Sequence, residues 1–128
     1  MFAESMAGFL EINEYGIVDK NIFVNLFPQR TEIPDAICVT ELQAFSIKGR
    51  ARNSVNFNCQ IRVRNRFSSK AQEIALNIYN LLNKDGFMVD ANGKRFTVRP
   101  MNPPTYLTTD TGGRANWVLN VTGLSLNY

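Results

Sequence analysis

The feature that most constrains this chain is a run of ten residues in which apolar and polar side chains alternate strictly. In Val55–Arg64, valine, phenylalanine, cysteine and isoleucine occupy every second position, with asparagine, glutamine and arginine between them. Because successive side chains of a β-strand point to opposite faces, this period of two predicts a strand with one face in the core and one face outside it.

A second β-rich segment, residues 36–44, begins shortly after a proline. A polar stretch at 48–54 that contains glycine separates it from the alternating strand. Together the two strands predict a long hairpin at about 36–65, with its tip around residues 46–53. Such a tip is either an arm that reaches onto another subunit or a loose surface loop.

Both cysteines of the chain, Cys38 and Cys59, fall within this hairpin. A register that pairs Leu42 with Val55 would place them opposite each other, where a disulfide could form. In a reducing cytoplasm, buried free thiols are the expected state. Histidine is absent, and two thiols without histidine cannot make a tetrahedral zinc site, so we expect no metal site.

Two segments have the apolar spacing of an amphipathic helix. The first opens the chain, and we expect it to stop at Gly16. The second is the strongest helical signal and carries its apolar stripe over residues 71–82. Ser69 and Gln72 are predicted to form a capping box at its start, and the pair at 85–86 to end it.

The remaining segments are β-rich, with strands predicted at 22–24, 87–89, 95–98, 106–109 and 115–126. The order of helix, strands, helix and strands predicts an α+β fold. We expect a mainly antiparallel sheet with the N-terminal and central helices packed on one side. The chain has 128 residues, which fits a single domain over 1–128.

The composition argues against catalysis. Without histidine the chain lacks the commonest general base near neutral pH, and Ser68 and Ser69 are interpreted as helix-capping residues rather than nucleophiles. We therefore expect a protein that is not an enzyme and holds no cofactor. No apolar run approaches the roughly 18 residues of a membrane span, so no membrane partner is expected.

Basic side chains are the most informative functional feature. Arg62, Arg64 and Arg66 fall on the polar face of the alternating strand, and Arg50 and Arg52 fall in the expected hairpin tip. Guanidinium groups pair with phosphate and with carboxylate. These arginines therefore either contact a neighbouring subunit, line the lumen of an oligomer, or are simply solvated. The formal net charge of +3 permits contact with nucleic acid without requiring it.

The segment 108–114 indicates a second tip, since it combines threonine, aspartate and two glycines. Its Asp110 and Arg114 either bond across subunits or stay within a simple turn. The candidates for a subunit interface or a lumen are therefore Arg50, Arg52, Arg62, Arg64, Arg66, Asp110 and Arg114.

The order of these elements resembles the tail terminator family of long-tailed bacteriophages with non-contractile tails, which includes minor capsid and head-tail joining proteins. The resemblance rests on short phrases in a shared order across nearly the whole chain. They are Gly16-Ile17, Asn21-Ile22-Phe23-Val24 with Pro28 soon after, the alternation at 58–64, the helix of the form Ala-x-x-Ile-Ala-x-x-Ile-Tyr-x-x-Leu at 71–82, and the closing segment 113–120.

The resemblance implies a structural subunit that forms a hexameric ring at the head-proximal end of the tail tube. Such a ring ends tail polymerisation and provides the surface that joins the head. The implied partners are further copies of the chain, the major tail tube protein and the head connector or completion protein, with DNA passing through without specific binding. The implied location is the head-tail junction of the virion, after assembly in the cytoplasm of the bacterial host.

Two other functions stay open at this point. A nucleic-acid-binding module would use Arg62, Arg64 and Arg66 against phosphate, and steeply salt-dependent binding of DNA would favour it. A neighbouring head connector or head-completion protein would share the fold class, because a fold does not fix a function.

Overall fold

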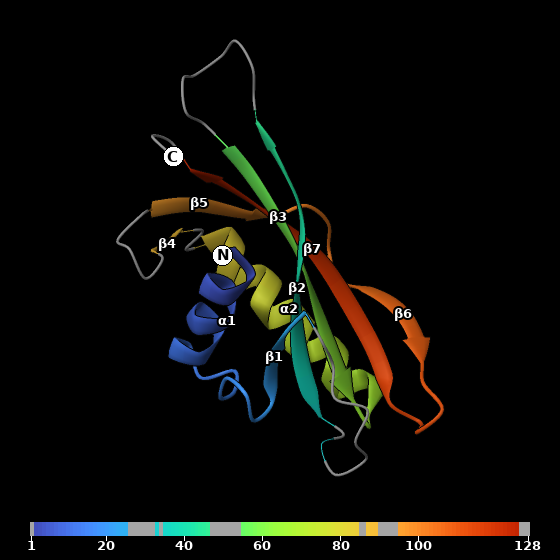
Figure 1. Ribbon diagram of the computed structural model, residues 1–128. Coiled ribbons are helices and arrows are strands. Elements are labelled where there is room, and N and C mark those ends of the chain that lie inside the picture. The colour runs from blue at the N-terminus through green and yellow to red at the C-terminus, as the bar shows by residue number, and fades with distance from the viewer. Residues whose placement is uncertain are drawn as a thin grey trace.

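The computed structural model describes residues 2–25, 33, 35–46, 55–84, 87–89 and 95–125. The elements, in chain order, are α1 (Phe2–Ile12), β1 (Ile22–Val24), β2 (Ala36–Ser46), β3 (Val55–Asn65), α2 (Ser68–Lys84), β4 (Phe87–Val89), β5 (Arg95–Pro100), β6 (Thr105–Thr109) and β7 (Ala115–Ser125) (Figure 1). The α+β class and the long hairpin of β2 and β3 are confirmed.

The strands form one sheet in the order β1-β2-β3-β7-β5-β4. Among the described strands only β1 and β2 pair in parallel, so the sheet is mainly antiparallel as predicted. Strand β7 pairs with β3 without interruption, from Val55↔Ser125 to Asn65↔Ala115. Its other edge pairs with β5 and then with β6, which therefore borders the sheet opposite β1.

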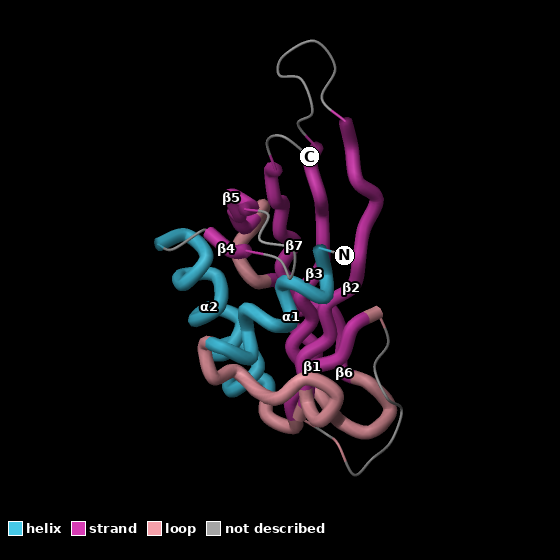
Figure 2. Tube along the Cα trace, turned by 60° about the vertical axis from the view of Figure 1, so that its left-hand side comes forward, coloured by secondary structure: helices cyan, strands magenta, loops and turns pink. Residues whose placement is uncertain are grey.

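Both helices pack on one side of the sheet, which gives the protein two layers (Figure 2). The alternation of β3 sorts its side chains as expected, because Cys59, Ile61 and Val63 are buried in the cluster that joins the helices to the sheet. We call this side the core face. The intervening positions, which include Asn58, Gln60, Arg62 and Arg64, lie on the opposite side, which we call the open face.

The predicted pairing of the two cysteines is wrong. Leu42 pairs with Asn58 rather than with Val55, because β2 continues past its predicted end at residue 44 and Ser46 is the residue that pairs with Val55. As a result Cys38 lies on the open face and Cys59 on the core face, and both are buried thiols rather than halves of a disulfide. Burial raises the pKa of the Cys59 thiol, and the negative charge of nearby Glu41 raises it further.

Helix α1 ends before the predicted glycine. Glu14 takes the left-handed conformation with φ 66°, and the amide of Tyr15 donates to the carbonyl of Leu10 at 3.0 Å. This pattern is the Schellman motif that closes many helices. Gly16 serves a different purpose, since a Cβ there would lie 2.6 Å from Oδ1 of Asn21.

The predicted capping box of α2 is also wrong. The helix begins at Ser68, and the carbonyl of Phe67 accepts the amide of Ala71 at 3.0 Å. Phe67 is therefore the capping residue, and Ser69 lies inside the first turn. Phe67 has no side-chain acceptor for the first-turn amides, but its own amide donates to Oδ1 of Asn65 at 3.0 Å, which fixes the chain at the start of the helix.

A close approach between β7 and α1 predicts a sensitive position. A Cβ on Gly123 would lie 2.6 Å from the buried ring of Phe2. We expect Gly123→Ala to lower the free energy of unfolding by about 1–3 kcal/mol, because the ring must move out of a packed core. Urea denaturation measures the change.

The matched control is the same substitution at Gly8 of α1, where a Cβ would meet nothing within 4 Å. Alanine is a better helix former than glycine, so Gly8→Ala should leave stability unchanged or raise it by up to about 1 kcal/mol. Equal destabilisation by the two variants would contradict the packing described for Gly123.

Candidate functional site

Four of the seven residues predicted at an interface or lumen come together on the open face. A pocket of about 410 Å³ lies between β3, β7 and the turn that joins β6 to β7. Its lining consists of Arg62, Arg64, Thr109, Asp110, Thr111, Arg114 and Asn116. We call it the arginine pocket. The alternating strand and the second tip are far apart in the sequence, and the pairing of β3 with β7 brings them together.

Two arginines reach the pocket from β3 and are held by hydrogen bonds. Nε of Arg62 donates to Oδ1 of Asn116 at 2.9 Å, and the Asn116 side chain in turn donates to the carbonyl of Arg114 at 3.1 Å. Nη2 of Arg64 donates to the carbonyl of Ile33 at 2.7 Å. Arg64 is buried and Arg62 is half-buried, so the pocket offers Arg62 most openly.

One carboxylate organises the turn above these arginines. Oδ1 of Asp110 accepts the amides of Gly112 and Arg114 at 2.9 and 3.0 Å, and Oδ2 lies 2.8 Å from Nε of Arg114. Gly113 has φ 77°, a conformation that glycine adopts without strain. Asp110 and Arg114 therefore bond within their own chain, in a turn.

The electrostatics of the pocket favour an anion. Burial lowers the pKa of Arg64, the charges of Arg114 and Arg62 lower it further, and Asp110 opposes them. For Asp110, burial acts to raise the pKa, but hydrogen bonds from Arg114 and Gly112 and the charge of Arg114 outweigh it, so the pKa lies below its usual value. Among the described residues that line the pocket, three are arginines and one is a carboxylate, so the lining is positively charged and suits a carboxylate or phosphate of a partner.

The other predicted residues lie elsewhere. Arg66 follows the end of β3, and its Nη2 lies 3.1 Å from Oδ2 of Asp35 in an exposed ion pair. It is therefore not on the strand face where we expected it. Arg50 and Arg52 lie outside the described residues, as does almost all of the expected hairpin tip.

Sequence reasoning missed Asn116, which is fully buried yet polar. The available signal was its position, because it alternates with Trp117, Leu119 and Val121 along β7 and so belongs to the open face. Within the described ranges, no three side chains of the metal-binding types cluster together. The helices described there are too short or too polar to cross a membrane.

Asp110 makes the stability of the turn depend on pH. Its pKa is lowered by folding, so its stabilisation is fully present above the unfolded pKa of about 3.9 and is lost as pH falls through the folded value. We expect Asp110→Asn to reduce the unfolding free energy at pH 7 by about 1–3 kcal/mol. The gap between wild type and variant should close as the pH is lowered below about 4.

Denaturation of both proteins between pH 7 and pH 2 measures this gap. The control is Glu73→Gln, which removes an exposed carboxylate paired with Lys70 at 3.9 Å and should cost less than about 0.5 kcal/mol at pH 7. A gap for Asp110→Asn that stays constant over the whole range would contradict the role given to this carboxylate.

Over residues 9–123 the chain matches a family model described as bacteriophage tail terminator protein. A solved structure that is 13% identical superposes with a TM-score of 0.56, over 99% of this chain and 91% of that chain, which supports the fold alone. No curated protein sequence matches the chain. Because the family model matches well over half of the 128 residues, including β3, β6 and nearly all of β7, this chain belongs to the bacteriophage tail terminator family, a family of phage tail structural proteins.

Proposed function

We propose that this protein forms a ring at the head-proximal end of the tail tube, where it stops tube growth and provides the surface that joins the head. The observation that carries the proposal is the match to the tail terminator family over residues 9–123. The mechanism is geometric. One face of the ring fits the last ring of tail tube protein, and the other face does not accept a further one.

A ring requires an interface between two different surfaces of the same subunit, related by a rotation that closes. We propose six subunits in the virion, with the major tail tube protein on one side and the head connector or completion protein on the other. DNA passes through the lumen without being held. Assembly takes place in the cytoplasm of the bacterial host.

The chemistry of the arginine pocket supports binding rather than turnover. Arginine stays protonated in proteins and cannot serve as a general base at neutral pH. Asp110 is engaged by the amides of its own turn and by Arg114, and its lowered pKa keeps it ionised. These groups suit the electrostatic recognition of a partner, so we propose that the protein is not an enzyme.

Removal of the protein from the phage tests this function. A phage with an early stop codon in this gene should produce tails of irregular and excessive length that lack heads, because nothing ends the tube. Electron microscopy of the lysate measures tail lengths, and the wild-type gene on a plasmid is the control that restores joined particles. Tails of normal length attached to filled heads in the mutant lysate would refute the role.

Nucleic-acid binding is a second candidate because three guanidinium groups line one pocket. A channel that lets DNA pass should bind it weakly, since each phosphate contact adds affinity and salt dependence. We expect the isolated chain to bind duplex DNA with a Kd no tighter than about 10⁻⁵ M at physiological salt, the non-specific range. Titration at two salt concentrations measures this, and tight, steeply salt-dependent binding would favour the second candidate.

A further inference from the structure

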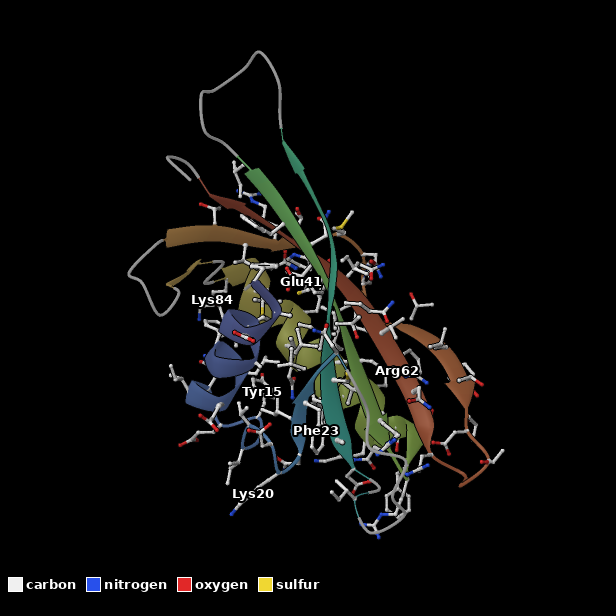
Figure 3. All side chains as sticks on the ribbon, viewed as in Figure 1. Tyr15, Lys20, Phe23, Glu41, Arg62 and Lys84 are labelled. Atoms are coloured by element: carbon white, nitrogen blue, oxygen red, sulfur yellow. The ribbon has the colours of Figure 1, made fainter. Side chains whose placement is uncertain are left out.

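The two edges of the sheet differ in charge. Strand β1 borders one edge and β6 borders the other, with β2, β3 and β7 between them. The segment that leads into β1 is acidic in balance, with Glu11, Glu14 and Asp19 against Lys20, whereas β6 and the turn after it border the arginine pocket. In Figure 3, Tyr15 and Lys20 lie toward one side of the molecule and Arg62 lies toward the other, so the two edges are well separated.

The acidic side consists of residues 11–19, which we call the acidic edge segment. It exposes the carboxylates of Glu11, Glu14 and Asp19. It also exposes two large apolar side chains, Ile12 at 80% and Ile17 at 51%. Single exposed apolar side chains are common on protein surfaces, but here two of them lie in the same nine-residue segment as three carboxylates.

The acidic edge segment is held in a fixed shape. The amide of Val18 donates to the Glu11 side chain at 2.7 Å, and the amide of Ile17 donates to Oδ1 of Asn21 at 2.6 Å. The carbonyl of Ile17 accepts amides from the turn that follows. A segment already ordered in this way loses little conformational entropy on binding.

The opposite edge has the complementary properties. Every residue of β6 is exposed, including Tyr106 at 47% and Leu107 at 49%. One edge of β6 pairs with β7, and no described strand pairs with the other. The strand lies next to the arginine pocket, which Thr109 helps to line. This edge therefore offers apolar contacts beside a positively charged hollow.

We propose that the acidic edge segment of one copy docks against β6 of the next copy and places its carboxylates at the arginine pocket. The inference rests on the proposed ring and names the contact that would build it. The surfaces match in charge and each supplies two exposed apolar side chains, whereas DNA would match the charge alone. Because the two surfaces lie at opposite edges of the sheet, the contact is head-to-tail, which is the kind that closes rings.

A charge reversal tests the arginine side. Arg62→Glu should reduce ring formation on terminator-free tail tubes by at least about tenfold, because like charges would face each other across the joint. The matched control is Arg66→Glu, which makes the same change at an exposed site outside the pocket and should assemble normally. Electron microscopy and chemical cross-linking measure the rings, and circular dichroism of each variant reports its folding.

The opposite reversal tests the acidic side. The double variant Glu14→Arg, Asp19→Arg should also fail to assemble alone, with Glu73→Arg on α2 as its control. Mixed in equal amounts, the Arg62→Glu and double variants should regain rings, because an alternating arrangement pairs opposite charges at every joint. Two variants that had merely failed to fold could not restore each other.

The outcomes separate the joint from the proposed function. Wild-type protein that forms no ring on tail tubes would overturn the ring and the joint with it. If the wild type forms rings and Arg62→Glu assembles normally, the proposed joint is wrong. The joint is also wrong if the wild type forms rings but mixing the two variants restores none. In both cases the proposed ring itself would remain supported. Loss of DNA retention by an Arg62→Glu variant that assembles normally would assign the pocket to nucleic acid instead.

Discussion

The pairing of β3 with β7 is the interaction on which the rest of this structure depends. The two strands stay in register over eleven residue pairs. Because side chains alternate between faces, a slip of one residue would turn Ile61 and Val63 out of the core and drive Arg62 into it. Burial of an unpaired charge costs several kcal/mol, so the apolar face enforces the register. The same register places Arg62 and Arg64 next to Asn116, and these three residues line the arginine pocket.

The layers and faces of this fold could be predicted because hydrophobic periodicity reports burial directly. The hairpin, both helices and the inward face of β7 follow from it. The ends of the helices and strands could not be predicted from periodicity, because each end depends on a single local or long-range contact. The amide of Ala3 in the first turn of α1 donates to Glu41 on β2, and the amide of Phe67, just before α2, donates to the side chain of Asn65. The extension of β2 to Ser46, which pairs with Val55, likewise leaves no trace in the alternation of β3, so the predicted cysteine pairing was wrong.

The candidate site could be predicted in two halves but not as a whole. The outward positions of β3 identify Arg62 and Arg64, and the turn signal identifies Asp110 and Arg114. The two halves meet because β7 follows the turn in the chain and pairs with β3. Asn116 of β7 accepts the hydrogen bond from Arg62 at this contact. Arg66 seemed to continue the series, yet the strand ends one residue earlier and its side chain pairs with Asp35. Spacing alone cannot tell where a strand stops.

A ring that ends a polymer needs subunit contacts with a defined angle, because a small error at each joint prevents closure. Long basic side chains that move freely in solvent define such an angle badly, because fixing each of them on binding costs about 2 kcal/mol of rotamer entropy. In the arginine pocket that loss has already occurred on folding. Asn116 holds Arg62, the Ile33 carbonyl holds Arg64 and Asp110 holds Arg114. The pocket therefore presents its charges as part of the rigid sheet, and an arriving carboxylate would meet a surface whose direction the core has already set.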